Sequence, residues 1–515
     1  MKKAIRILSL LLILLILLTS CDLIGLPGEA ETDAYMCDSH EDADDNGYCD
    51  ICAVSVLVNI DFYVINDIHG KFDDTSSNEG VDELTSYLKK MNETDDYAVF
   101  LSSGDMWQGS PESNLTKGLI MTEWMNDLDF VSMTLGNHEF DWGEDYIKAN
   151  EEIAEFPFLA INIFDRKTNK RVDYCEPSVV IERGGIQIGI IGAIGNCYSS
   201  ISADKTTDIY FKTGSDLTNL IKSEAERLIN EGVDYIVYSI HDGFENNKNS
   251  DYYASNSDIS YYYSPELSNG YVDLVFEGHT HKKYVLIDQY GIYHMQNGGE
   301  NQGISHVEIR INSVTGSSKV SDAEIVSSKT YTAYADDPSI DALLEKYKDV
   351  ISISGTVLGT NDRKRDDTEI EALVAQLYYN AGFEKWGEQY DIVLGGGFIK
   401  TRSPYDLKAG TIIYGDLHSL FPFDNEIVLC SIKGKDLLNK FINTDNSDYF
   451  VYYGEYGNSI KNSVDPNATY YLICDSYTSS YAYNRLTVID TYEADVFARD
   501  LVAEFIKRGG LTTTK

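Results

Sequence analysis

The sequence predicts an α/β protein with two domains. Its 515 residues are enough for two sizeable cores, and 43% of them are hydrophobic. From residue 56 onward, strand-like apolar runs alternate with helix-like stretches, which favours a layered α/β domain over residues 56–330. A proline followed by an amphipathic pattern predicts a linker helix over residues 331–350. A smaller α/β or α+β domain is expected over residues 351–515.

The chain is strongly acidic. It has 41 Lys and Arg residues against 83 Asp and Glu residues, which gives a formal net charge of −42. The long-range field of such a chain repels phosphate backbones, so the composition argues against a nucleic-acid polymer as partner. A cationic metal site could still attract a small anion locally. The acidity therefore does not exclude phosphate chemistry.

Residues 1–20 have the pattern of a signal peptide. Basic residues precede the apolar run ILSLLLILLILL, which is short for a membrane span. The run leads into LTSC, which resembles the lipobox of bacterial lipoproteins, where the cysteine (here Cys21) is lipidated. Plain secretory cleavage near Ser20 is the alternative. We expect the mature protein outside the cytoplasmic membrane, on the cell surface or the periplasmic face, anchored by a lipid at Cys21.

Residues 21–55 form a Cys- and Asp-rich segment that we interpret as a stalk. Cys37-x2-His40 and Cys49-x2-Cys52 have a spacing suited to tetrahedral zinc. Of the eight cysteines, seven remain if one carries the lipid, and an odd number cannot all pair within one chain. Two interpretations remain for this segment: a small structural zinc site, or an acidic spacer linked by a disulfide.

The same segment contains the front half of a calcium loop. Asp42, Asp44, Asn46 and Gly47 have the required spacing, but Ala53 stands where a bidentate Glu is expected. Calcium binding is therefore the weaker interpretation of this stretch.

Five strand-like runs of the first domain end in side chains of metal-ligand type. A single Asp after a strand is most often a turn or cap, and a lone His is most often a hydrogen-bonded group. The carboxyl ends of strands in open α/β sheets lie together, so these five loops are expected to converge. Their joint occurrence favours a two-metal centre. The residues are Asp67, His69, Asp105, Asn137, His138, His241, His279 and His281.

The motifs NDIHG, GDMWQGS, GNHEFDWG, HDG and GHTH follow one another in this order. They resemble the calcineurin-like metallophosphoesterases, specifically the bacterial 5′-nucleotidase/UDP-sugar hydrolase/2′,3′-cyclic phosphodiesterase family. The resemblance covers nearly everything after residue 56. It implies a four-layer α-β-β-α metallophosphoesterase domain followed by a 5′-nucleotidase-type C-terminal substrate-binding domain.

The resemblance implies two divalent metal ions with Asp105 as the bridging ligand. The implied ligands of one metal are Asp67, His69, Asp105 and His281, and those of the other are Asp105, Asn137, His241 and His279. Some relatives have Gln or Asn where this chain has His281. Zn, Mn, Fe and Co all suit such ligands, so the sequence leaves the metal open.

His138 and Asp141 match a dyad that lies near the scissile phosphate in the family. Asp141 would orient the imidazole, and His138 would stabilise the phosphoryl charge or protonate the leaving group. The alternative is that His138 only hydrogen-bonds a metal ligand.

Substrate recognition is expected in the C-terminal domain. The family carries an Asn-Gly-Gly-x-x-Arg-like loop there, but this chain has Leu394 or Gly395 in place of the Asn, and the basic residue is Lys400 or Arg402. The glycines that follow could cradle a phosphate with backbone N–H groups. The residues assigned to substrate binding are Gly396, Gly397, Arg402, Phe423 and Tyr477.

Two aromatic residues are candidates for holding a nucleobase. Phe423 matches the first stacking aromatic of the family, although a core position is equally compatible with it. Tyr477 could supply the second, but the glycine-rich, Asp-containing loop that follows it in the family is absent here. The recognition loops therefore depart from the family pattern while the metal motifs do not.

Together these patterns predict an extracellular, metal-dependent phosphoester hydrolase. The expected activity is that of a 5′-nucleotidase, which releases phosphate from nucleotides by means of a metal-activated hydroxide. A cyclic-nucleotide phosphodiesterase or a nucleotide-sugar pyrophosphatase of the same fold is the alternative. A non-catalytic surface ligand-binding protein is a second one, although the presence of every expected ligand argues against it. The sequence leaves the oligomeric state open.

Overall fold

The computed structural model describes the chain from residue 37 to residue 512, with gaps. The described residues are 37, 39–72, 80–244, 263–399, 401, 406–442, 450–455, 459–481 and 485–512. The predicted signal peptide, the predicted lipid anchor Cys21 and the predicted substrate residue Arg402 lie outside them. Within the described ranges, no helix combines the length and the apolar character that crossing a membrane requires.

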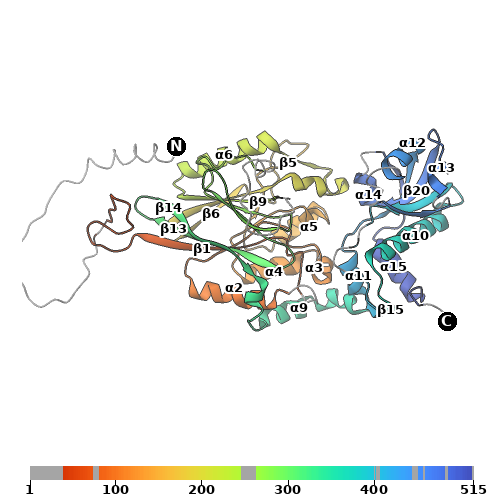
Figure 1. The fold of residues 1–515 in the computed structure, drawn as a ribbon, viewed down its shortest axis with the longest axis horizontal. Helices are drawn as coiled ribbons and strands as arrows, with labels where there is room; N and C mark the ends of the chain where they lie inside the picture. Colours follow the sequence, from red (N-terminus) through yellow and green to blue (C-terminus); the bar gives the residue numbers. More distant parts are fainter. Residues whose placement is uncertain are drawn as a thin grey trace, which may run out of the picture.

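A pair of six-stranded sheets forms the centre of the first domain (Figure 1). The strands of the first sheet are β1 (Leu57–Ile65), β2 (Val99–Ser102), β3 (Ser132–Thr134), β4 (Phe158–Leu159), β13 (Gly303–Asn312) and β14 (Ser318–Ser327). Those of the second are β6 (Ser178–Arg183), β7 (Ile186–Ile194), β9 (Tyr235–His241), β10 (Leu274–Glu277), β11 (Lys283–Ile287) and β12 (Tyr293–Asn297). The spatial orders are β14-β13-β1-β2-β3-β4 and β11-β12-β10-β9-β7-β6. Two short strands, β5 (Ile163–Asp165) and β8 (Ile209–Phe211), pair separately.

Apolar side chains from both sheets form one core between them. β1 contributes Ile60, Phe62 and Val64, which alternate along the strand and so share one face of the sheet. The ring of Phe62 lies 5.9 Å from that of Phe276 on β10, measured between centroids. Val237 of β9 belongs to the same cluster. The two sheets therefore pack face to face.

Helices cover the outer faces of both sheets. The helices of this domain are α2 (Asp82–Thr94), α3 (Pro111–Thr116), α4 (Leu119–Asp127), α5 (Glu144–Glu151), α6 (Gly214–Asn230), α8 (Ser328–Tyr331) and α9 (Pro338–Ile351). On α6, Leu217, Ile221 and Leu228 recur at helical spacing and pack on the second sheet. Helices α2, α4, α5 and α9 pack against the first sheet. The predicted four-layer α-β-β-α arrangement is confirmed.

The strand directions bring the predicted metal ligands to one edge. β1, β2 and β3 are parallel neighbours, and so are β9 and β10 in the other sheet. The carboxyl ends of parallel neighbours lie at the same edge of a sheet, so the residues that follow these strands are close in space.

A second sheet system forms the C-terminal domain. Its strands are β15 (Val357–Asn361), β16 (Ile392–Gly397), β17 (Gly410–Ile413), β18 (Ile427–Lys433), β19 (Val451–Gly454), β20 (Thr469–Asp475) and β21 (Thr487–Thr491). Its helices are α10 (Asp367–Trp386), α11 (Tyr414–Leu420), α12 (Gly434–Leu437), α13 (Ile460–Ser463), α14 (Ser476–Tyr481) and α15 (Ala498–Lys507). The five-stranded sheet has the order β19-β16-β20-β18-β21, and buried apolar side chains form a cluster on each of its faces.

The two domains contact one another through the loop after α11. Asn114 of α3 donates from Nδ2 to the carbonyl of Pro422, with a distance of 3.0 Å. Asp424 is ion-paired with Lys117 of the first domain and with Arg499 of its own domain. Arg499 also donates to the carbonyl of Phe423 at 3.0 Å. This loop is therefore held in place from both sides.

His418 on α11 should make the stability of the C-terminal domain depend on pH. Its side chain is buried, and neither ring nitrogen has a hydrogen-bond partner among the described residues. Burial and the nearby Arg499 charge lower its pKa from 6.5 to about 3. The folded domain therefore excludes a proton that the unfolded chain binds below pH 6.5, so stability is lost as the pH falls from there toward 3. We expect a loss of about 2 kcal/mol between pH 7 and pH 5 from this group.

Denaturant unfolding at both pH values, compared between the wild type and His418→Phe, measures this contribution. The variant keeps an aromatic ring but has no titrating group, so its loss of stability over this pH range should be smaller by about that amount. An equal pH dependence in both proteins would contradict the assignment.

Candidate metal centre

The predicted ligands converge where both sheets end. Donor atoms of Asp67, His69 and His281 lie within 4.8 Å of one another, and so do those of Asp67, Asp105 and His241. His281 Nε2 is 3.3 Å from Asp67 Oδ1. His241 Nε2 is 3.0 Å from Asp105 Oδ2. Loops from β1, β2, β9 and β10 thus form one cluster.

The backbone at this cluster is strained. Asp67, His69, Asp105, His279 and His281 all have positive φ, between 53° and 71°. L-residues other than Gly rarely adopt this region, because the β-carbon crowds the backbone. Such residues concentrate at functional sites, where the surrounding structure holds them in place. Five residues of this kind in one cluster indicate a site that is maintained at a cost in stability.

Two glycines allow the loops to approach this closely. A β-carbon on Gly136 would lie 2.3 Å from Asp105 Oδ1, and one on Gly104 would lie 2.7 Å from His241 Nδ1. Gly104 also has a φ of +96°. Any larger residue at either position would push the Asp105 loop away from its partners.

Hydrogen bonds to the second ring nitrogen fix the tautomers of two histidines. His241 Nδ1 is 2.6 Å from the carbonyl of Ser103, and His69 Nδ1 is 2.9 Å from that of Gln108. A carbonyl only accepts, so the hydrogen is on Nδ1 and a neutral ring presents its Nε2 lone pair to the cluster. The Nε2 lone pair of His241 faces a carboxylate oxygen of Asp105. The Nε2 lone pair of His69 faces His281 Nε2 at 3.0 Å. A shared cation satisfies both contacts.

The electrostatics of the cluster also favour bound positive charge. Burial lowers the pKa of His241, but the Asp105 carboxylate raises it more. The result is a pKa of about 10. Asn137 Oδ1 is buried and has no hydrogen-bond partner among the described residues. A nitrogen and oxygen donor set of this composition, with an unpartnered amide oxygen, fits divalent transition-metal ions.

Glu139 organises the cluster, and the sequence analysis did not identify it. Its buried carboxylate accepts from the backbone N–H groups of Asp105, Met106 and Gly136, at 2.9, 2.8 and 2.7 Å. Burial, together with the Asp105 charge, raises its pKa to about 7. Glu139 therefore joins the loops after β2 and β3 without pointing at a ligand position.

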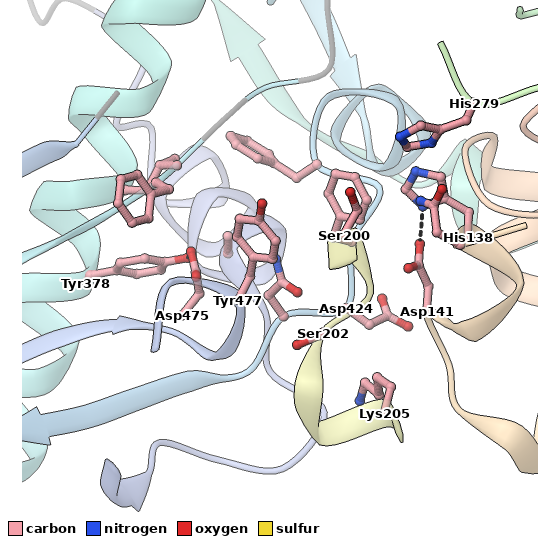
Figure 2. Close-up of a pocket in the computed structure, with 17 residues that line it drawn as sticks. His138, Asp141, Ser200, Ser202, Lys205, His279, Tyr378, Asp424, Asp475 and Tyr477 are labelled. Carbon is pink, nitrogen blue, oxygen red and sulfur yellow. Dashed lines mark hydrogen bonds and ion pairs between the residues drawn. The ribbon is translucent and has the colours of Figure 1, made fainter. Parts of the chain in front are cut away.

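The predicted dyad is formed. His138 begins a short helical turn, η1 (His138–Phe140), and its Nδ1 is 2.8 Å from Asp141 Oδ2 (Figure 2). The backbone N–H of His138 donates to Asp105 Oδ1 at 2.8 Å. Its Nε2 is 4.0 Å from Asp105 Oδ2. His138 is thus fixed beside the metal cluster and oriented by Asp141.

A cavity of about 550 Å³ lies between the two domains (Figure 2). Asn137, His138 and His279 line it from the first domain. Phe423 and Tyr477 line it from the second. The ring of Phe423 lies over His138, with centroids 5.7 Å apart. The candidate metal ligands and the predicted aromatic residues therefore face one space.

The two predicted glycines lie elsewhere. Gly396 and Gly397 form the end of β16, where they pair with Tyr452 and Val451 of β19. A β-carbon on Gly397 would lie 2.5 Å from Thr478 Oγ1. Both are buried, and neither is among the residues that line the cavity. The structure gives them a packing role, and their assignment to substrate binding stays a prediction.

Several lining residues were not predicted. Ser200 ends the short helical turn η2 (Asn196–Ser200), Lys205 lies in η3 (Ala203–Thr206), and Ser202 lies between these two turns of the first domain. This stretch follows β7, which is parallel to β9 and ends at the same edge of the sheet. That position in the sequence was the signal from which these residues could have been predicted to line the site. Behind the cluster, the Cys197 thiol donates to the carbonyl of His241 at 2.8 Å.

Comparison with known proteins identifies the fold. Residues 60–283 match the family described as calcineurin-like phosphoesterase. This part of the chain is a calcineurin-like phosphoesterase domain. The chain is 25% identical to the protein UshA of Yersinia enterocolitica over 415 residues, which are 72% of this chain and 72% of that protein. It is 26% identical to the endonuclease YhcR of Bacillus subtilis over 429 residues, which are 75% of this chain and 33% of that protein.

A solved 5′-nucleotidase precursor from Thermus thermophilus shares the architecture. The TM-score is 0.64 at 17% identity, and the match covers 88% of this chain and 96% of that one. The match therefore includes the second domain as well as the phosphoesterase domain. The prediction is therefore confirmed for the calcineurin-like phosphoesterase domain, for the similarity to a UshA protein and for the two-domain fold of a solved 5′-nucleotidase.

Proposed function

We propose that this protein is a metal-dependent 5′-nucleotidase of the cell surface. The observation that carries the proposal is the cavity shared by the two domains, in which His138 and the metal cluster face Phe423 and Tyr477. A nucleotide whose phosphate is bound at the metal ligands would place its nucleoside in this cavity, beside Phe423 and Tyr477. The alternative of a ligand-binding protein without turnover is disfavoured, because the dyad geometry serves no evident purpose in simple capture.

The ligands would hold two divalent cations. Asp67, His69, Asp105 and His281 would bind one, and Asp105, Asn137, His241 and His279 the other. When bound, such cations supply Lewis-acid polarisation of a phosphate and a lowered pKa of coordinated water. Donor atoms of Asp105 lie within 4.8 Å of those of Asp67 and His69 from the first set and of that of His241 from the second.

His138 would act on the reacting phosphate. Its Nδ1–H is committed to Asp141, so Nε2 is the atom available to the substrate. A protonated Nε2 there would donate to a phosphoryl oxygen or give its proton to the departing oxygen. Phe423 packs over the ring and shields this hydrogen bond from water, which strengthens it.

Phe423 and Tyr477 would select the substrate by stacking on a nucleobase. Lys205, which lines the cavity from the first domain, would attract further phosphate charge. The C-terminal recognition loops depart from the family pattern. A cyclic-nucleotide phosphodiesterase or nucleotide-sugar pyrophosphatase of the same fold is therefore the second candidate. The signal peptide and Cys21 support a lipid-anchored location outside the cytoplasmic membrane.

Phosphate release from a panel of substrates tests the proposal. The full chain is depleted of metal, resupplied with Mn²⁺ or Zn²⁺, and assayed with AMP, ATP, UDP-glucose, 2′,3′-cyclic AMP and p-nitrophenyl phosphate. We expect metal-dependent turnover in which AMP has the highest kcat/KM. Phe423→Ala should raise KM for AMP about 10-fold through lost stacking.

Phe383→Ala is the matched control, because this phenylalanine is 56% exposed on α10.

A single-stranded oligonucleotide is added to the panel of substrates, since one relative is named an endonuclease. The net charge of −42 predicts no cleavage of it. Turnover led by the cyclic nucleotide or by UDP-glucose would transfer the assignment to the second candidate. No turnover with either metal would favour the binding protein.

A further inference from the structure

Four side chains near the beginning of the described chain form a compact cluster. Cys37 Sγ is 3.2 Å from His40 Nδ1, 3.5 Å from Cys49 Sγ and 3.3 Å from Cys52 Sγ. Cys52 Sγ is 3.5 Å from His40 Nδ1. All four donor atoms lie within 4.8 Å of one another. The cluster is separate from the cavity and has a different donor set.

These distances fit metal ligands better than a disulfide. Bonded sulfurs are about 2.05 Å apart, whereas thiolates at about 2.3 Å from a tetrahedral zinc lie about 3.8 Å from each other. All three sulfurs are free thiols in the structure. Three thiolates this close would repel one another strongly, so a shared cation would stabilise them.

A tight turn places two of the cysteines on the same side. Cys49 N–H donates to the carbonyl of Val54, and Ala53 N–H donates to that of Cys49, both at 2.8 Å. Ala53 has a positive φ of 59°, which reverses the chain immediately after Cys52. The Cys-x2-Cys spacing is therefore folded as a ligand-bearing turn.

The hydrogen bonds of Asp42 disfavour the calcium interpretation of this segment. Asp42 would be the first calcium ligand, but its Oδ1 accepts from the N–H of Asn46 at 3.0 Å and its Oδ2 from that of Gly47 at 2.8 Å. Oδ2 also accepts from Asn312 Nδ2 at 2.6 Å. The two oxygens of this carboxylate thus accept three hydrogen bonds from the protein, and calcium binding stays the weaker interpretation.

The segment is also docked and does not form a free stalk. Besides its bond to Asp42, Asn312 donates to Asp45 Oδ1 at 2.9 Å. The hydroxyls of Thr315 and Ser317 donate to the same oxygen at 2.6 Å. These partners lie at the turn between β13 and β14, where Figure 1 shows residues 39–55 at the end of the molecule away from the second domain.

We propose that Cys37, His40, Cys49 and Cys52 bind one structural zinc ion, which holds this loop against the β13–β14 turn. Four protein ligands close the coordination sphere and leave no position for a substrate, as in structural zinc sites. The site would fix the end of the domain that follows the predicted lipid anchor in the sequence. It does not depend on the catalytic assignment.

Cobalt substitution of the full chain tests the proposal. Thiolate ligands give Co²⁺ an intense near-ultraviolet charge-transfer band that nitrogen and oxygen ligands do not give. We expect the metal-depleted wild type to develop this band with one equivalent of Co²⁺ per chain, and Cys49→Ser to lack it. His40→Cys supplies a fourth thiolate, so it should retain one equivalent and show that the loop still folds.

Two further variants assign the band. Cys197→Ser removes the cysteine nearest the other metal cluster, and Cys175→Ser removes a buried cysteine far from the four ligands in sequence. Both should keep the band. Loss of the band in Cys197→Ser with retention in Cys49→Ser would overturn the proposal. So would a disulfide joining two of Cys37, Cys49 and Cys52, found by mass spectrometry of alkylated protein. Phosphate release, measured in parallel, separates this result from the fate of the proposed function.

Discussion

Replacing Asp105 by Asn is expected to lower kcat with AMP by on the order of 10³-fold or more. The carboxylate is buried between the two ligand groups, 3.0 Å from His241 Nε2, and it also accepts from the backbone of His138. An amide removes one negative charge and one oxygen donor from the centre of the cluster. Both proposed cations would therefore bind more weakly.

Metal content by mass spectrometry and initial rates at saturating metal together measure this effect. Asp145→Asn is the matched control, because its side chain is 96% exposed on α5 and its removal changes the net charge equally. The control should retain nearly full activity. An Asp105→Asn variant with wild-type metal content and rate would contradict the assignment of this residue as the bridging ligand.

The sequence predicted the convergence of the candidate metal ligands, because this convergence depends on the strand topology that the sequence pattern indicates. Parallel strands end at a common edge, so ligand-type residues after β1, β2, β9 and β10 had to be near one another. Glu139 could not be identified in this way. Its role depends on the N–H groups of Asp105 and Gly136 facing the same space, and this requires the folded loops.

Glycine runs and acidic repeats were less informative, because each serves more than one purpose. Gly395 lies where a β-carbon would be 2.2 Å from the backbone nitrogen of Tyr379 on α10, so the run allows a helix to pack closely on β16. Asp42 has the spacing of a calcium ligand, but it accepts a hydrogen bond from Asn312, as its neighbour Asp45 does. A contact between positions so far apart in the chain has no local signature.

The second large effect concerns the dyad. His138→Ala is expected to lower kcat by about 10² to 10⁴-fold, the usual range for a general acid or base, with metal content unchanged. Asp141→Asn should cost about 10 to 100-fold, since the ring remains but its Nδ1–H loses the carboxylate 2.8 Å away. Loss of metal from His138→Ala would instead indicate that this residue is a ligand.

The substrate dependence of the His138 effect separates its two possible roles. A nucleoside alkoxide is a poor leaving group and requires a proton, whereas p-nitrophenolate departs without one. If Nε2 protonates the departing oxygen, His138→Ala should reduce kcat for AMP far more than for p-nitrophenyl phosphate. If it stabilises charge on the phosphoryl group, both substrates should lose a similar factor, because that charge develops with either leaving group. The position of His138, between Asp105 and the Phe423 ring, is compatible with both roles, so the ratio of the two losses decides between them.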